Sequence, residues 1–262
     1  MVDYFEKIGM GAIDMSFESL DFKDSSWRSV LYAAAKRAKE KNIALPLCHL
    51  SFYMPDPKRD DLMKKFQGEL MQGIDAAALM GIERAVTHPI AFYSKEATYG
   101  DWVRANMAFL SPVVEYGRKK GVRVCIENMP SEREAADNHL YGSCALNVTS
   151  LAEKLGCGVC WDTGHANVSG YKQSEQLGVI GDKLEVLHVH DNDGKRDLHL
   201  PPFDGSIDWE DVARGLRGCN SPFIVDVEVT AWALDGDRKT REDFGRLIIN
   251  RARRFLSLAE QF

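Results

Sequence analysis

The stretch VCWDTGH, residues 159–165, contains the pattern that decides the fold of this chain. Val159, Cys160 and Trp161 form a short apolar run of the kind that becomes a buried β-strand. Asp162 and His165 follow at a turn, where their polar side chains would lie beyond the carboxyl end of the strand. Similar runs occur at residues 12–17, 43–50, 84–89, 123–129, 184–190 and 223–229.

Longer stretches with helical periodicity separate these runs, for example SWRSVLYAAAKRAKEKN and NMAFLSPVVEYGRKKG, and they end in Gly or Asn as helix C-caps do. Strands that alternate with helices are typical of a parallel sheet wrapped by helices. The length of 262 residues and the apolar content of 45% fit one domain better than two. We therefore expect a single (β/α)8 TIM barrel over residues 1–262.

The strand candidates number seven, whereas a closed barrel of this class needs eight. The sequence opens on VDYFEKIGMG, which resembles a first helix leading into the second strand. An open seam would expose two sheet edges, which folded proteins normally avoid. We therefore expect that the first strand is missing from the N-terminus of this sequence, or that another segment closes the gap.

Composition and charge narrow the class of protein. The net charge of −6 argues against a general attraction to nucleic acid or anionic membranes. The opening residues lack a basic and apolar leader, and no apolar run is long enough to cross a membrane, so we expect a cytoplasmic protein. The 6 cysteines are irregularly spaced and give no disulfide framework. Cys157 and Cys160 form a C-x-x-C within a strand candidate, which argues against a redox or zinc-ribbon motif.

Side chains that can bind a metal ion follow the strand candidates one after another. Parallel strands of a barrel bring their carboxyl ends to one mouth, so these residues would lie close together. Carboxylate plus imidazole suits zinc, manganese or cobalt. The candidates are His49, His88, Glu127, Asp162, His165, His190, Asp197, His199 and Glu228.

Each candidate also has a structural interpretation. Glu127 in CIENMP and Glu228 in VDVEVT end β-branched runs, where an isolated carboxylate would be costly to bury, but structural salt bridges would also explain them. Asp162 can be a helix N-cap. His190 ends LEVLHVH before the turn signal DNDG, so it is a better ligand candidate than a random core histidine.

Two further residues are candidates for support beneath the metal site. His188 lies two residues before His190 on the same strand face, hence one layer deeper, and Asp226 has the same offset from Glu228. If their strands are neighbours, we expect His188 and Asp226 to form a buried pair that supports the ligands from below.

The remaining candidates are weaker when taken singly. Asp197 and His199 form a D-x-H motif whose spacing lets both reach one metal, although a solvated, exposed pair is a common alternative. His49 and His88 could each be a hydrogen-bonded structural histidine. Their shared position after apolar runs favours the functional interpretation of the whole set.

These motifs, in this order, resemble the xylose isomerase-like barrel superfamily, which contains sugar isomerases and epimerases together with endonuclease IV. The resemblance covers residues 12–228, and its motifs are His49, THP around His88, IEN around Glu127, DTGHA from Asp162, HDND from His190, DLH from Asp197, and Glu228. In the sugar-directed branch, the resemblance implies one divalent ion held by Glu127, Asp162, His190 and Glu228. In endonuclease IV the positions that match all nine candidates hold three zinc ions.

The resemblance leads us to expect a metal-dependent sugar or sugar-phosphate isomerase or epimerase, with a manganese, cobalt, magnesium or zinc ion. Glu127 and Glu228 would act as the acid and base, and His49 and His165 would hold substrate hydroxyls. The resemblance also points toward a homodimer.

Two alternatives are an endonuclease IV-like phosphodiesterase with up to three zinc ions, acting at abasic DNA sites, and a barrel that binds sugar phosphates without turnover. The acidic rim segment SFESLDFKDSS (16–26) offers little for phosphate contacts and favours a small sugar over DNA.

Overall fold

The structure is a computed structural model that describes residues 2–18, 20–52, 58–90, 97–131, 141–229 and 238–261. The chain divides into two compact units. The first includes Met1–Phe92, Ala97–Ile126 and Leu151–Gly158, and the second includes Glu127–Ser150 and Val159–Phe262.

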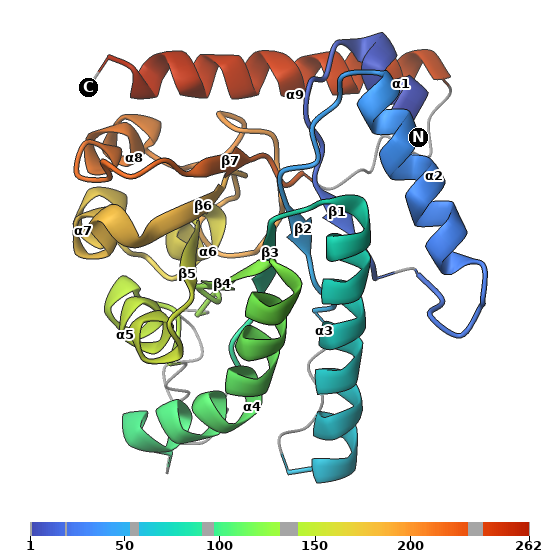
Figure 1. Ribbon diagram of the computed structural model, residues 1–262. Coiled ribbons are helices and arrows are strands. Elements are labelled where there is room, and N and C mark those ends of the chain that lie inside the picture. The colour runs from blue at the N-terminus through green and yellow to red at the C-terminus, as the bar shows by residue number, and fades with distance from the viewer. Residues whose placement is uncertain are drawn as a thin grey trace. The chain divides into compact units, whose positions relative to one another are not determined.

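The first unit is built on a parallel sheet in which neighbouring strands follow chain order (Figure 1). Its strands are β1 (Met15–Ser16), β2 (Cys48–His49), β3 (Arg84–Thr87) and β4 (Arg123–Glu127), whose last residue belongs to the second unit. Its helices are α1 (Val2–Ile8), α2 (Trp27–Glu40), α3 (Asp60–Met80) and α4 (Tyr99–Lys120). In the register, Met15 lies beside Cys48, and His49 lies beside Val86.

Glycines end the two long helices of this unit, as the sequence predicts. Gly81 after α3 and Gly121 after α4 both adopt a left-handed conformation with φ of 75°, which a residue with a Cβ rarely tolerates. At the other end of α4, Thr98 and Asp101 form a reciprocal capping box. These caps turn the chain back so that each helix is followed directly by the next strand.

The second unit contains a parallel sheet of three strands, β5 (Gly158–Asp162), β6 (Leu184–His188) and β7 (Ile224–Asp226). Its helices are α6 (Thr163–Val168), α7 (Gln173–Ile180), the 3-10 turn η1 (Gly181–Lys183), α8 (Trp209–Leu216) and α9 (Arg238–Ala259). Helix α5 (Ala145–Leu155) has residues in both units. The register sets Asp162 beside His188, and His188 beside Asp226, so three polar side chains end three neighbouring strands.

Every predicted run contains a strand, and the described residues hold seven strands in all. The strands are shorter than the runs, because several residues beyond each carboxyl end belong to loops. All 6 cysteines are free thiols. Among the described residues, no helix combines the length and the apolar character that crossing a membrane requires.

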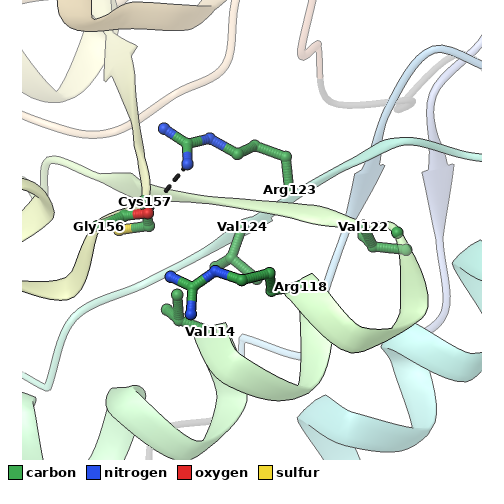
Figure 2. Close-up of a pocket in the computed structure, with 8 residues that line it drawn as sticks. Val114, Arg118, Val122, Arg123, Val124, Gly156 and Cys157 are labelled. Carbon is green, nitrogen blue, oxygen red and sulfur yellow. Dashed lines mark hydrogen bonds between the residues drawn. The ribbon is translucent and has the colours of Figure 1, made fainter.

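A small pocket of about 220 Å³ opens at the amino ends of β4 and β5 in the first unit (Figure 2). Arg118 and Arg123 line it, and Arg123 donates a hydrogen bond to the Gly156 carbonyl oxygen at 2.9 Å. A basic side chain at this place meets a carbonyl group where α5 ends. The pocket lies at the end of the strands opposite to the one that carries the candidate residues, so we assign it to the packing of the fold.

Candidate metal centre

Asp162 is held by the turn that starts α6. As the N-cap of this helix it has an extended backbone, and its Oδ1 accepts a hydrogen bond from the His165 amide at 2.6 Å. The N-cap interpretation is therefore confirmed. Its second oxygen, Oδ2, lies 3.0 Å from His190 Nε2, so one carboxylate caps the helix and also faces the site.

Asn128 holds the same turn from the neighbouring strand end, and the sequence analysis did not single it out. Its side-chain Nδ2 donates to the Asp162 carbonyl oxygen at 3.1 Å, and the Asp162 amide donates to its Oδ1 at 2.6 Å. His165 Nδ1 lies 2.7 Å from the Asn128 carbonyl oxygen, which can only accept, so the ring donates there and its Nε2 faces the site. In the sequence, this role of Asn128 was indicated only by its place as a polar residue directly after Glu127 in IENMP.

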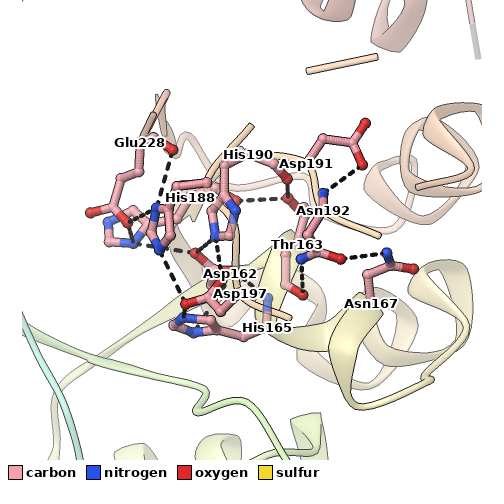
Figure 3. Close-up of polar contacts among 12 residues, drawn as sticks. Asp162, Thr163, His165, Asn167, His188, His190, Asp191, Asn192, Asp197 and Glu228 are labelled. Atoms are coloured by element: carbon pink, nitrogen blue, oxygen red, sulfur yellow. Dashed lines mark hydrogen bonds and ion pairs between the residues drawn. The ribbon is translucent and has the colours of Figure 1, made fainter. Parts of the chain in front are cut away.

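Four side chains form what we call the first donor group: Glu127, Asp162, His188 and Glu228, whose ligand atoms lie within 4.8 Å of one another. His188 Nδ1 is their centre, at 3.1 Å from Glu127 Oε1, 3.4 Å from Glu228 Oε2 and 3.9 Å from Asp162 Oδ2 (Figure 3). Three of the four are buried, and only Glu228 is partly exposed.

The histidine in this group is His188, whereas the sequence analysis expected His190. Strand β6 ends at His188, and the register aligns that residue with Asp162. His190 lies two residues further, in the following loop. His188 turns Nδ1 to the carboxylates, and its Nε2 lies 3.8 Å from Asp226 Oδ2, longer than a direct hydrogen bond. The support role expected of this pair stays a prediction.

Four other side chains form the second donor group: His165, His190, Asp197 and His199, also within 4.8 Å of one another. Asp197 Oδ2 lies 3.2 Å from the Nε2 atoms of both His165 and His199. The D-x-H pair is thus in contact with the buried His165, while Asp197 itself is exposed and His199 is partly exposed.

The imidazole rings and carboxylates of this site shift one another's pKa values. Burial alone would lower the pKa of His165, but the charge of Asp162, the hydrogen bond that His165 donates to Asp197 and the charge of Glu127 raise it to about 10. Burial raises the pKa of Asp197, yet hydrogen bonds with His165 and His199 hold it well below its ordinary value. The site therefore has the negative potential that attracts a cation.

Asp191 anchors the loop that carries Asp197 and His199. Its buried carboxylate accepts hydrogen bonds from the amides of Asn192, Phe203 and Ile207 and from the indole of Trp209, at 2.9–3.1 Å. The Asp191 amide donates to the Leu200 carbonyl oxygen, and the Leu200 amide donates to the Asp191 carbonyl oxygen, both at 2.8 Å. The sequence pointed to this loop through HDND and D-x-H, but not to the aspartate that organises it.

His49 and His88 belong to the first unit. Their ring centroids lie 4.9 Å apart, and the Phe52 ring packs against both of them. His49 Nδ1 also lies 2.7 Å from the Leu50 carbonyl oxygen, so it donates there and keeps Nε2 for another partner. The structure brings these two histidines together, and their contribution to the same mouth as the other seven stays a prediction.

The first donor group fits a divalent cation. Three carboxylates held this close together in a buried place repel one another, and His188 is the one imidazole among them. Oxygen donors with one nitrogen suit manganese, cobalt, magnesium and zinc. Nearby, His190 Nδ1 is buried and has no hydrogen-bond partner among the described residues. The donor set and its packing are those of a metal centre more than of a salt-bridge network.

Comparison with known proteins gives a family match and similar solved structures. A family model described as xylose isomerase-like TIM barrel matches residues 2–248. The uncharacterized protein MJ1311 of Methanocaldococcus jannaschii is 26% identical over 162 residues, which cover 61% of this chain and 55% of that relative. The match therefore spans little more than half the length of this relative.

Two solved structures resemble this chain along nearly its whole length. A D-tagatose 3-epimerase-like protein superposes with a TM-score of 0.74 and 20% identity, over 96% of this chain and 90% of that one. The IOLI protein with a binding zinc atom superposes with a TM-score of 0.76 and 14% identity, over 100% of this chain and 92% of that one. At such identities the likeness shows the fold alone.

Proposed function

Because the chain belongs to the xylose isomerase-like TIM barrel family, we propose that it is a metal-dependent isomerase or epimerase of a keto sugar or sugar phosphate. The barrel expected from the sequence follows from this membership. The observation that carries the function is the first donor group, in which Glu127 at the end of β4 and Glu228 beyond the end of β7 flank one imidazole nitrogen at 3.1 and 3.4 Å. The D-tagatose 3-epimerase-like protein among the similar folds supports the same class of substrate.

The residues that would hold the ion are Glu127, Asp162 and Glu228 together with one histidine. That histidine is His190, as expected from the sequence, whose Nε2 lies 3.0 Å from Asp162 Oδ2, or His188, which lies among the three carboxylates. When bound, a divalent ion polarises the carbonyl group of a ketose and makes the neighbouring carbon-bound proton easier to remove. Asp226 would support His188 from the side of its second ring nitrogen, at 3.8 Å.

Proton transfer would be carried by the two glutamates. One takes the proton from the carbon next to the carbonyl, and the other returns a proton to the substrate. Glu228 is partly exposed and can meet a substrate that arrives from solvent, whereas Glu127 is buried. His165, held by Asn128 with its Nε2 facing the site, is placed to hold a hydroxyl group.

The test is proton exchange followed by NMR in deuterated water, with a panel of ketoses and ketose phosphates. We expect deuterium to enter the substrate at the carbon next to the carbonyl in the wild type. Glu127→Gln and Glu228→Gln should each lower the rate by about 10²–10⁴-fold. Glu210→Gln, on the exposed face of α8, is the matched control and should keep the wild-type rate. Wild-type turnover in Glu228→Gln would refute the assignment.

One other candidate is an endonuclease IV-like phosphodiesterase with more than one zinc ion, which would need the second donor group as ligands. Elemental analysis of protein purified without chelator separates the two functions. About three zinc ions per chain, with a loss on Asp197→Ala, would favour the phosphodiesterase and lead to an abasic-site nicking assay. One ion per chain, unchanged in Asp197→Ala, would favour the isomerase or epimerase.

A further inference from the structure

Cys160 is a buried thiol beside the first donor group, and the proposed reaction does not use it. It lies on β5 two residues before Asp162, so the two side chains point to the same face of the sheet. Its Sγ, one carboxylate oxygen of Glu127 and one ring nitrogen of His188 lie within 4.8 Å of one another. Among the described residues, this is the one set of possible metal ligands that includes a sulfur atom.

The three side chains of this set, which we call the sulfur donor group, are buried together. Cys160 and His188 are 0% exposed, and Glu127 is 1% exposed. Each of them belongs to a strand, Glu127 to β4, Cys160 to β5 and His188 to β6, so the sheet fixes where they lie. Donors on rigid elements need little rearrangement to bind an ion.

The three donors differ in kind, and together they suit a soft divalent cation. Thiolate sulfur selects zinc and similar soft ions, whereas magnesium and calcium prefer oxygen ligands. A thiolate and a carboxylate carry two negative charges, which neutralise a divalent cation in a buried place where an uncompensated charge would be costly. The neutral imidazole of His188 adds a third bond without changing this charge balance.

A cysteine in a core can also be a small apolar side chain that only fills space. The surroundings of Cys160 are not those of such a residue, because they include an imidazole and two carboxylates. Burial, together with the charges of Glu127 and Asp162, raises the pKa of the Cys160 thiol well above its ordinary value, against the opposing effect of His188. The sulfur is therefore protonated until a cation displaces the proton.

We propose that Glu127, Cys160 and His188 form a binding site for a soft divalent cation, zinc or cadmium. When the ion binds, the S–H bond of Cys160 breaks, its proton passes to water, and the sulfur forms a bond to the metal with no change of oxidation state. The site leaves Asp162, His190 and Glu228 for the ion of the proposed reaction, with which it would share Glu127. It goes beyond the proposed function and does not depend on it.

The test is cadmium titration of the purified protein, followed by the ultraviolet charge-transfer absorption of a cadmium–thiolate bond. We expect this absorption in the wild type and its loss in Cys160→Ala. Cys157→Ala is the matched control, because Cys157 precedes β5, belongs to the first unit and lines the small pocket there, and it should keep the absorption. Cys160→Ser, which keeps the size of the side chain, replaces Cys160→Ala if that variant does not fold.

His188→Gln and Glu127→Gln test the other two donors. Each should shift the titration to higher cadmium concentration, because the sulfur stays but one of its partner ligands is lost. Absorption that persists in Cys160→Ala would mean that another thiol binds the ion. Cadmium binding to the wild type without this absorption would mean that only oxygen and nitrogen donors bind it. Either result overturns the proposal, as does an unshifted titration in both His188→Gln and Glu127→Gln.

The outcome is separate from that of the proposed function. Deuterium exchange into ketoses tests the reaction, and cadmium–thiolate absorption tests the sulfur donor group. A protein that shows the absorption, loses it in Cys160→Ala and exchanges no ketose proton would refute the reaction and leave this site standing. A protein that exchanges ketose protons and shows no absorption with cadmium would refute this site and leave the reaction standing.

Discussion

Gly164 is the residue at which the packing of the candidate centre is tightest. Its backbone does not need a left-handed conformation, so the requirement for glycine comes from the close approach of the His190 ring. The signal in the sequence was the DTGH turn itself, but a glycine between a threonine and a histidine indicates only a turn. That a buried ring from another strand end lies against it follows from the fold.

Gly164→Ala should therefore displace His190. The new Cβ would lie 1.9 Å from His190 Cε1, and neither the ring nor the turn can move freely, so we expect destabilisation by about 1–3 kcal/mol and weaker zinc binding. Thermal unfolding and zinc titration measure the two effects. Gly178→Ala in α7 is the matched control, because nothing lies within 4 Å of its Cβ, and it should stabilise by about 0.5–1 kcal/mol. Wild-type stability and affinity in Gly164→Ala would contradict the packing argument.

Asp191 and Asp193 in the HDND motif look alike in the sequence and differ in their surroundings. Asp191→Asn replaces a buried carboxylate that accepts four hydrogen bonds by an amide with one acceptor oxygen, which leaves donors such as the Trp209 indole without an acceptor. We expect a loss of about 1–3 kcal/mol in unfolding free energy and altered Trp209 fluorescence. Asp193 is exposed and pairs with Arg196, so Asp193→Asn should have little effect. Equal effects of the two substitutions would refute the anchoring role.

The choice between His188 and His190 marks where sequence reasoning reached its limit. Both residues are on the same face of the strand candidate, so periodicity cannot separate them. What decides is the point at which β6 ends, and strand ends are the least certain part of a sequence-based prediction. The register aligns His188 with Asp162 and leaves His190 in the loop, and which of the two binds the ion stays a prediction.

Among the secondary-structure elements, the ends of helices were easier to predict than the ends of strands. The glycines after α3 and α4 have a chemical reason to be there, which can be recognised without the fold. Strands such as β1 and β2 have only two residues each, because most of the apolar run around them pairs irregularly or not at all. An apolar run in the sequence predicts a buried extended segment. The number of its residues that join the sheet depends on which backbone groups of the neighbouring strands face them.

The N-terminal cap of α4 gives a prediction at this scale. Thr98 accepts a hydrogen bond from the Asp101 amide, and Asp101 accepts from Thr98 in return. Thr98→Ala should lower the unfolding free energy by about 1 kcal/mol, measured by denaturant titration. Ser26, the N-cap of α2, makes no such side-chain bond, so Ser26→Ala should cost no capping energy. A larger loss in Ser26→Ala than in Thr98→Ala would contradict this assignment.

The contact between α7 and α8 predicts a pH dependence. Burial raises the pKa of Asp211, but hydrogen bonds from the Ser174 amide and hydroxyl at 3.0 and 2.8 Å outweigh it, so the net shift is downward. A carboxyl group whose pKa is lowered in the folded state stabilises the fold at pH values above its unfolded pKa, which is near 3.9 for Asp. This stabilisation is lost as the pH falls through the pKa of the folded state. Asp211→Asn should therefore be less stable than wild type at pH 7, and the difference should shrink below about pH 4. A difference independent of pH would refute the charge-based account.

At the scale of the whole molecule, the alternation of strand runs with helical stretches was enough to predict the fold class. The candidate site was predicted in its residue types, because carboxylates and imidazoles at successive strand ends have few other uses. Their division into two donor groups and the anchoring by Asn128 and Asp191 depend on hydrogen bonds between distant residues. Such contacts have no periodicity from which they could have been predicted.

The last prediction concerns the stability of the whole chain. An ion held by the first donor group binds the folded state, in which Glu127, Asp162, His188 and Glu228 are together, and not the unfolded chain, in which they are apart. Zinc or manganese at 100 times its dissociation constant should then raise the unfolding free energy by about 2.7 kcal/mol over chelator-treated protein. Differential scanning calorimetry with and without added metal measures this shift.

The matched variants decide whether the stabilisation comes from this site. Glu127→Gln removes one charged donor and should lose most of the metal-induced shift, whereas Glu210→Gln on α8 should keep it. An equal shift in both variants would mean that the ion binds elsewhere on the acidic surface. The first donor group would then be a buried polar network, and the chemistry assigned to its two glutamates would have no ion to work with.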